Sequence, residues 1–264
     1  MLVTSTGRFH VVDEGEGSTL VFVHGFPLSH AMWKHQPAEF SRTHRVIIPD
    51  LRGFGQSTAT TPIASLSDHA DDLAQLLDQL QIQEPIVLCG LSMGGYIAFR
   101  FLEKYPARLR GLILCDTKAT PDTPEAAQNR RNMADQVLEQ GSQIIVDAML
   151  PKLFSSETQK SQPQIIDETR RVMKSTAPEA IAAAQRAMAA RPDSTPQLAR
   201  ISVPTLVVVG ESDALATPAE MAAMAAAIPG AKFEQIPLAG HLAPLEQPAV
   251  VNAVMRTYLD SLSN

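Results

Sequence analysis

Ser92 lies in a stretch whose residue types could turn a serine hydroxyl into a nucleophile. The stretch reads GLSMGG over residues 90–95, after an apolar run at 85–89 and before a helical pattern at 96–102. Small residues on both sides of the serine let a strand turn sharply into a helix and hold the side chain in a projecting, strained position. A Gly-x-Ser-x-Gly pattern alone is a weak signal, because glycine and serine are common in loops. The strand before it and the helix after it favour Ser92 as the nucleophile.

His241 is the histidine best placed to act as the base that a serine hydroxyl needs. It lies in the loop 238–244, directly beyond the last predicted strand. Loops at the carboxyl edge of a parallel sheet commonly deliver residues to a site. His24 is interpreted as a structural residue that holds its loop in place, and His69 is expected on an exposed or half-buried helix face. The other histidines lie in or beside predicted strands and helices and are interpreted as structural or solvated: His10, His30, His35 and His44.

A carboxylate that orients the histidine should come from the same edge of the sheet. Asp213 follows the apolar run at 205–209 and is the preferred candidate. Two rivals stay open, because Glu211 is closer to the same strand and Asp116 ends the preceding one. With Asp213, the order along the chain is serine, aspartate, histidine.

Apolar runs that alternate with amphipathic helical patterns must position these side chains. The predicted strands cover residues 8–14, 19–24, 45–49, 86–91, 111–116, 205–210 and 233–237. Helices are predicted over 94–104, 218–228 and 249–262. Another helix is predicted to begin near Ser67, and the spacing of its apolar residues places Asp72 on the solvent-exposed face. This alternation predicts an α/β fold, with a mostly parallel sheet and helices on both of its faces.

The alternation stops between Thr117 and Ser202, where the sequence contains helical stretches and no convincing strand. So long an insertion without strands of its own favours a helical lid over a loop. The predicted organisation is therefore a core of residues 1–117 and 203–264, with a helical lid inserted at 118–202. Two or three apolar lid side chains are expected to face a substrate, and methionines suit that role because they adapt to varied apolar shapes.

The composition is that of an ordinary soluble globular protein, since 45% of the 264 residues are hydrophobic and 19% are charged. A net charge of −6 without a basic run argues against nucleic acid or an anionic membrane surface as the main partner. No apolar run is long enough to span a bilayer and the first residues lack the layout of a signal peptide, so a cytoplasmic protein is expected. Cys89 and Cys115 fall in apolar strands and are interpreted as buried reduced thiols.

Four separated motifs carry a resemblance to a known family: HGFP at 24–27, DLRGFGQS at 50–57, GLSMGG at 90–95, and Gly240-His241 with Asp213 upstream. From about Thr19 to Leu259 the chain resembles a lidded α/β-hydrolase, a superfamily that shares the order serine, aspartate, histidine. It is similar to small bacterial esterases, to enol-lactone hydrolases of aromatic degradation and to cofactor-free haloperoxidase-like esterases. Haloalkane dehalogenases and epoxide hydrolases of this fold carry an aspartate where this chain has Ser92.

The resemblance implies an eight-stranded, mostly parallel α/β-hydrolase sheet that is flanked by helices. It also implies an oxyanion hole made by the backbone N–H groups of Phe26 and Met93, which would stabilise the tetrahedral intermediate more than the ground state. The turn at 50–57 is interpreted as structural. The sequence has no glycine-rich phosphate loop, dinucleotide fingerprint or His/Cys metal cluster, so neither a cofactor nor a metal is expected.

The expected activity is that of a serine carboxylic ester hydrolase, with Ser92, His241 and Asp213 as a catalytic triad and an acyl-enzyme intermediate. A small-molecule ester or lactone is the expected substrate; its acyl and alcohol groups, and the oligomeric state, are open at this stage. Hydrolysis of a lactone or enol-lactone, perhydrolysis and acyl transfer would use the same residues. A ligand-binding receptor on a hydrolase scaffold is the alternative that is not an enzyme.

Overall fold

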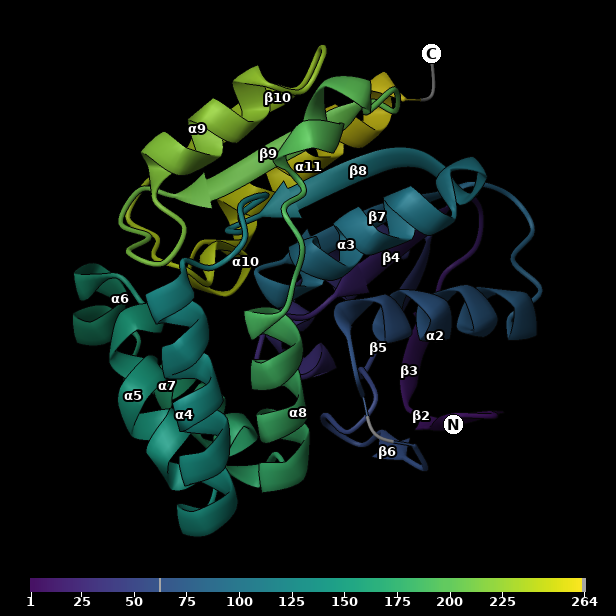
Figure 1. The fold of residues 1–264 in the computed structure, drawn as a ribbon. Helices are drawn as coiled ribbons and strands as arrows, with labels where there is room; N and C mark the ends of the chain where they lie inside the picture. The colour runs from purple at the N-terminus through teal and green to yellow at the C-terminus, as the bar shows by residue number, and fades with distance from the viewer. Residues whose placement is uncertain (62, 263–264) are drawn as a thin grey trace.

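The computed structural model describes residues 1–61 and 63–262, and a seven-stranded sheet runs through the centre of this part of the chain (Figure 1). All neighbouring strands are parallel except β3 and β5, which are antiparallel. This confirms the predicted α/β architecture with a mostly parallel sheet. From one edge to the other, the strands are β10 (Lys232–Ile236), β9 (Thr205–Gly210), β8 (Leu109–Cys115), β7 (Ile86–Leu91), β4 (Thr19–Val23), β5 (Arg45–Pro49) and β3 (Val11–Glu14).

The central strands bury side chains on both faces of the sheet, which explains their continuous apolar sequences. In β9, Val207 and Val209 belong to one hydrophobic core, whereas Leu206 and Val208 belong to the other. Successive side chains of a strand point to opposite faces, so one apolar run contributes to two cores. Both cysteines are buried as free thiols in the second of these cores.

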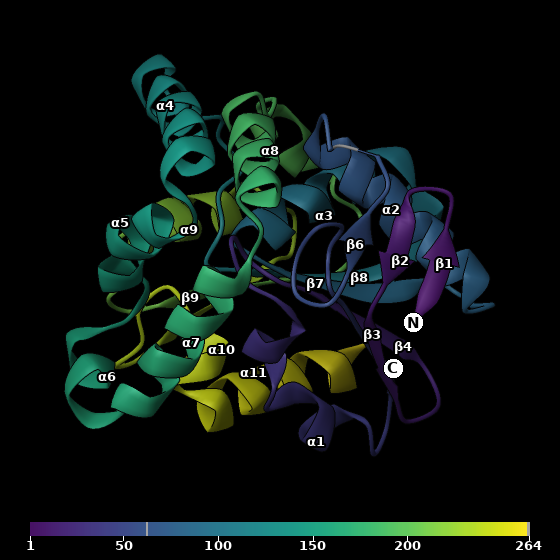
Figure 2. The same ribbon diagram turned by 90° about the horizontal axis from the view of Figure 1, so that it is seen from below.

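Helices cover both faces of the sheet (Figure 2). One face carries α2 (Leu66–Gln79), α3 (Met93–Lys104) and α9 (Pro218–Ala226). The opposite face carries α1 (Gln36–Phe40) and α11 (Pro248–Ser261). The shorter helical turns are η1 (His30–Trp33), η2 (Pro106–Arg108), η3 (Thr195–Arg200) and α10 (Ala243–Glu246).

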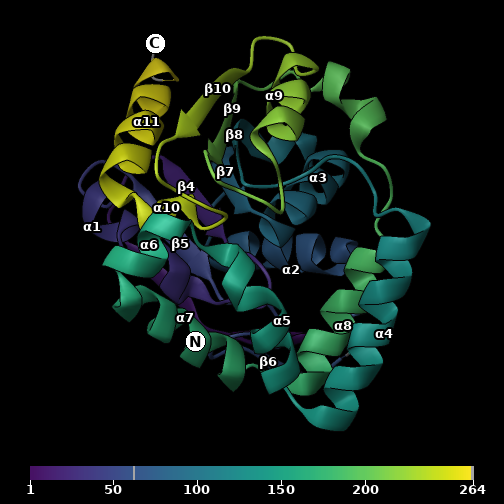
Figure 3. The ribbon, with the colours of Figure 1, turned by 90° about the vertical axis from the view of Figure 1, so that its left-hand side faces the viewer.

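Five further helices, which we call the inserted helices, lie between β8 and β9 in the sequence and gather at the carboxyl ends of the strands (Figures 1 and 3). Among them α4 packs against α8 and α5 against α7, and α8 also contacts α2. Their buried side chains join the same two cores as the sheet. No helix in the described ranges is long and apolar enough to cross a membrane. The inserted helices are α4 (Pro124–Gln140), α5 (Gln143–Leu153), α6 (Ser156–Ser161), α7 (Pro163–Ser175) and α8 (Pro178–Ala189).

The central sheet has seven strands in the described residues, not the expected eight, and the first predicted strand is divided in two. The division falls at His10, between β2 (Gly7–Phe9) and β3. There the His10 N–H donates to Ser57 Oγ and the His10 carbonyl accepts the Asp50 N–H, so a loop replaces the sheet partner. Strand β2 instead joins a separate three-stranded sheet with β1 (Leu2–Thr4) and β6 (Thr58–Ala59).

Helix α2 buries two polar side chains that its sequence pattern assigns to solvent or to a half-exposed face. Asp72 is 2% exposed and accepts two hydrogen bonds from the Arg52 guanidinium, of 2.5 and 2.8 Å. His69 is fully buried beside Phe54, and burial lowers the pKa of its imidazole to about 3. Both expectations are wrong because the turn at 50–57 packs on this face of α2. The spacing of apolar residues within a helix cannot show that a distant segment of the chain will cover its polar face.

Strand β7 and the first turn of helix α3 lie so close together that there is no room for a side chain between them at Gly90 and Gly94. A Cβ atom on Gly90 would lie 2.3 Å from the Gly94 carbonyl oxygen, and one on Gly94 would lie 2.3 Å from the Val23 carbonyl oxygen. Glycine at both positions therefore lets the helix begin directly against the sheet. This contact fixes where the chain must turn, at residue 92.

Replacing Gly90 by alanine should lower the free energy of unfolding by about 2–3 kcal/mol, because the new methyl group overlaps backbone that belongs to the core. Gly230→Ala is the matched control: its Cβ would meet no atom within 4 Å, and its φ of 70° should cost only about 1 kcal/mol. Urea denaturation followed by circular dichroism measures both values. Equal losses in the two variants would contradict the importance of this close packing.

Candidate active site

Ser92 occupies a strained turn between β7 and α3. Its φ and ψ angles are 54° and −114°, in the positive-φ half of backbone space that residues other than glycine rarely adopt. The Ser92 N–H donates to the Cys115 carbonyl oxygen at 3.0 Å, and the Ser92 carbonyl oxygen accepts the Thr117 hydroxyl at 2.7 Å. Both partners stand at the end of β8, so the neighbouring strand holds the serine in this conformation.

His241 and Asp213 meet at the same edge of the sheet. The Nδ1–H of His241 donates to Asp213 Oδ2 over 2.8 Å, and the two side chains are 5% and 0% exposed. The Asp213 Oδ1 atom accepts the N–H groups of Leu215 and Ala216 at 2.7 and 3.1 Å. These three donors satisfy a carboxylate at position 213. The hydrogen bond also sets the tautomer of His241, leaving its Nε2 able to accept a proton.

Neither rival carboxylate bonds to the His241 ring within residues 1–61 and 63–262. Asp116 is fully buried and its Oδ1 accepts one backbone N–H, at 2.8 Å. Burial, and secondly the nearby charge of Asp213, raises the pKa of the Asp116 carboxyl well above its usual value. A carboxyl that resists ionisation is a poor partner for an imidazolium. Glu211 is exposed, and its Oε2 accepts the Leu238 N–H at 3.1 Å.

Phe26 and Met93, the residues expected to form an oxyanion hole, lie on either side of the serine. Met93 is the first residue of α3, where backbone N–H groups have no partner inside the helix. The loop of Phe26 passes beside the serine, since a Cβ atom on Gly25 would lie 3.4 Å from the Ser92 Cβ. In the described part of the chain, neither the Phe26 nor the Met93 N–H donates to a protein acceptor. Both groups are therefore available to a ligand oxygen.

His24 holds the loop of Phe26 to the turn at 50–57. Its Nδ1–H donates to the Gly25 carbonyl oxygen at 2.9 Å, and its Nε2 accepts the Leu51 N–H at 3.0 Å. Burial lowers the pKa of this fully enclosed imidazole, which favours the neutral ring that such a pair of bonds requires. These contacts agree with the structural role expected for His24.

Glu246 is a buried carboxylate beside the histidine that the sequence patterns did not identify. Its Oε1 accepts the N–H groups of Gly240 at 2.8 Å and Leu242 at 3.3 Å, one on each side of His241. Its Oε2 accepts the Ser155 N–H at 2.8 Å, at the start of α6. One carboxylate therefore fixes the histidine loop and joins it to the inserted helices. A glutamate soon after a Gly-His pair in the last loop is the signal that could have indicated it.

Ser92 and His241 line one cavity of about 300 Å³ between the sheet edge and the inserted helices. Its apolar lining includes Met133, Met149 and Met188, which come from α4, α5 and α8. A volume of this size is typical of a site for a small molecule. Flexible thioether side chains let such a wall adapt to the shape of its ligand.

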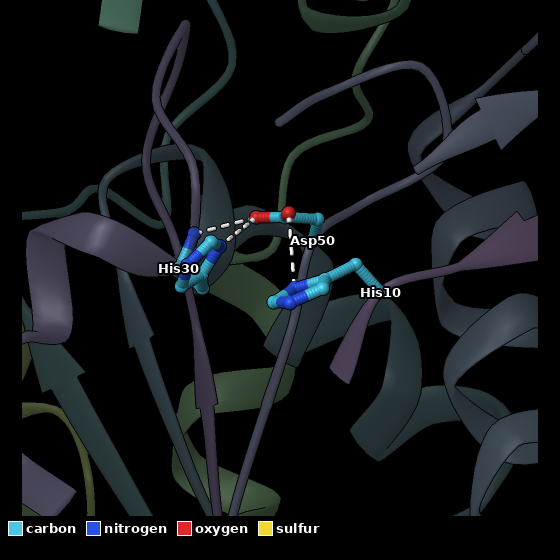
Figure 4. A group of neighbouring side chains, drawn as sticks. All are labelled: His10, His30 and Asp50. Atoms are coloured by element: carbon cyan, nitrogen blue, oxygen red, sulfur yellow. Dashed lines mark hydrogen bonds and ion pairs between the residues drawn. The ribbon is translucent and has the colours of Figure 1, made fainter. Parts of the chain in front are cut away.

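Within residues 1–61 and 63–262, one group of side chains has the types that commonly bind metals: His10, His30 and Asp50 (Figure 4). Their possible ligand atoms lie within 4.8 Å of one another. The Nδ1–H of His30 donates to Asp50 Oδ1 at 2.8 Å, and Nδ1 of His10 lies 3.4 Å from Asp50 Oδ2. The backbone N–H groups of His30 and Gln56 donate to the same two oxygens, at 2.7 and 2.8 Å. These donors satisfy the Asp50 carboxylate without an ion and attach the turn at 50–57 to two other segments.

A family model described as the alpha/beta hydrolase fold matches residues 18–248. The chain belongs to the α/β-hydrolase family. A thermophilic esterase from Thermogutta terrifontis, studied with malate bound, is 47% identical, with a TM-score of 0.96 over 98% of this chain and 95% of its own. The enol-lactonase from Burkholderia xenovorans LB400 is 29% identical, with a TM-score of 0.89 over 96% of this hydrolase and 97% of its own chain. The 3-oxoadipate enol-lactonase 2 of Acinetobacter baylyi is 29% identical over 93% of this chain and 91% of its own.

Substituting Asp213 and Asp116 one at a time should separate their roles in this α/β-hydrolase. Asp213→Asn should lower kcat on a short p-nitrophenyl ester by about 10⁴-fold, because an amide neither balances an imidazolium nor holds the same histidine tautomer. Asp116→Asn is the matched control and should keep most of the activity, because asparagine resembles the protonated acid. Initial rates on both variants test this, and a larger loss in Asp116→Asn would move the histidine's partner to position 116.

Replacing Glu246 by glutamine should slow hydrolysis in a protein that still folds. Glutamine has one acceptor oxygen in place of two, so it cannot accept both the N–H groups beside His241 and that of Ser155. We expect kcat to fall about tenfold, the consequence of losing one hydrogen bond to a charged group. Glu234→Gln, an exposed change of the same type on β10, is the control. A normal kcat together with a lowered Tm would assign Glu246 to stability alone.

Proposed function

We propose that this protein is a serine carboxylic ester hydrolase, in which Ser92 is the nucleophile, His241 the base and Asp213 the partner of His241. One observation carries the proposal: the strained Ser92 turn and the hydrogen-bonded His241–Asp213 pair come together at a single small-molecule cavity. The likeness to an esterase that is 47% identical over 98% of the chain supports the same reaction.

Acylation begins when Nε2 of His241 removes the Ser92 proton as the serine oxygen attacks the ester carbonyl carbon. Asp213 stabilises the imidazolium that forms. The N–H groups of Phe26 and Met93 receive the oxyanion, and each such donor contributes on the order of 10²–10³ in rate. His241 then gives its proton to the leaving alcohol, and the acyl group stays on Ser92.

Deacylation repeats these steps with water as the nucleophile. His241 takes a proton from the water as the water oxygen attacks the acyl carbonyl carbon. The second tetrahedral intermediate then collapses to the carboxylic acid, and His241 returns the proton to the leaving Ser92 oxygen. In this proposal residues 118–202 act as a lid on a core made of 1–117 and 203–264. The lid covers one side of the cavity and supplies most of its apolar wall, which lowers the amount of water near the reacting groups and strengthens electrostatic interactions there.

Lactone hydrolysis is the second candidate, and the enol-lactonases among the relatives favour it. A lactone presents the same carbonyl group to Ser92, but its leaving alcohol stays tethered to the acyl chain. Comparing kcat/KM for a small lactone with that for an open-chain ester of equal carbon number separates the two candidates. A clear preference for the lactone would make it the principal substrate.

Ser92→Ala should abolish hydrolysis of p-nitrophenyl butyrate, with a fall in kcat of at least about 10⁴-fold, because no other group can carry the acyl intermediate. The variant should keep its circular dichroism spectrum. Ser175→Ala, at an exposed position at the end of α7, controls for the loss of a hydroxyl. Undiminished turnover by Ser92→Ala would rule out the proposed mechanism.

A further inference from the structure

The cavity beside Ser92 has a lining of strongly positive charge in a chain whose net charge is −6. Its ionisable side chains, apart from His241, are four cations and one acid: Lys118, Arg130, Lys152, Arg191 and Asp122. A wall with this imbalance is unusual for a site that receives only neutral, apolar esters, because each cation near the cavity loses hydration when a ligand fills it.

Ion pairing neutralises part of this charge. Asp122 is shared by two guanidiniums, since its Oδ2 lies 2.6 Å from Arg130 Nε and its Oδ1 lies 2.7 Å from Arg191. Lys118 pairs with Glu220 of α9 at 2.7 Å. Four cations less these two carboxylates leave two positive charges uncompensated at the cavity.

Lys152 is the clearest of the uncompensated cations. It lies on α5 one helical turn after Ala148 and Met149 and two turns after Ile145, and these four residues form one face that lines the cavity. Within residues 1–61 and 63–262 no carboxylate is within ion-pair distance of its Nζ. Its ammonium group is therefore free to bind an anion that enters the cavity.

The positive charge and the serine line the same cavity. The Arg191 guanidinium lies over the ring of Tyr96, 4.4 Å from its centroid. Tyr96 follows Ser92 by four residues on α3, a rise of about 6 Å along the helix axis. A small molecule bound to Ser92 by its carbonyl group can thus reach the basic part of the wall with its other end.

We propose that the cavity selects esters or lactones that carry a carboxylate, and that Lys152, assisted by the Arg130–Asp122–Arg191 group, binds it. This inference rests on the proposed function and names its substrate class. The bond cleaved and the roles of Ser92 and His241 are unchanged. The substrate's carboxylate forms charge-assisted hydrogen bonds that a neutral ester of the same length cannot form, so the preference is a difference between the two binding free energies.

The test compares esters matched in length. Monomethyl adipate against methyl hexanoate places the carboxylate in the acyl part, and 4-butanoyloxybutanoate against butyl butanoate places it in the alcohol part. At low ionic strength the acidic ester of at least one pair should have a kcat/KM about tenfold or more higher, the range of one hydrogen bond to a charged group. Added salt should reduce the preference, because mobile ions screen an open cavity.

Lys152→Gln should remove most of the preference, and Lys152→Glu should reverse it. The ratio of the two kcat/KM values is the measurement, because a loss of folded protein lowers both rates equally. Lys174→Gln, an equal change of charge at an exposed position of α7 outside the cavity, should leave the ratio at its wild-type value.

The outcomes distinguish this inference from the function on which it rests. Turnover that depends on Ser92 but shows no preference in either pair, or a preference that Lys152→Gln leaves unchanged, would overturn the carboxylate site and keep the esterase. If Ser92→Ala hydrolyses both members of each pair as wild type does, the proposed function fails, and the substrate class fails with it.

Discussion

Helix α3 begins in direct contact with the ends of β4 and β7, and the rest of the site depends on that contact. Gly90 and Gly94 permit it because a Cβ atom on either would collide with backbone. The chain must then turn within one residue, which holds Ser92 at a positive φ, a conformation that costs about 1–3 kcal/mol. Hydrogen bonds from the end of β8 compensate, so rigid elements present the serine and no mobile loop is needed.

The carboxyl groups that meet at this edge of the sheet differ in the number of hydrogen-bond donors around them. Asp213 has two backbone N–H groups and the His241 ring around it, and Glu246 has three backbone N–H groups. Asp116 is equally buried, yet it accepts one N–H, and burial raises the pKa of its carboxyl. The number of donors that the fold supplies therefore decides which acid can serve as an ionised partner of the histidine.

Residues 118–202 give this acidic protein an uneven charge distribution, because the four cations that line the apolar cavity all come from this segment. A positive site within a negative molecule concentrates field lines at the cavity and discriminates between small molecules of different charge. The buried pair Arg52–Asp72 shows the contrasting case, in which a cation is fully matched and serves only to attach a turn to α2.

The sequence by itself determined the order of strands and helices, the family, and the positions of Ser92, Asp213 and His241 at strand ends. It could do so because strands buried on both faces need continuous apolar runs, and the carboxyl ends of parallel strands share one edge. Only the tertiary structure decided that His241 bonds Asp213 and not Asp116, that Glu246 holds the histidine loop, and that Asp72 and His69 are buried. The break in the first strand at His10 and the grouping of cations around one cavity also depend on the tertiary structure. These features come from contacts between segments far apart in the chain. The side-chain periods of a strand (two residues) and of a helix (3.6 residues) describe only local structure and do not predict such contacts.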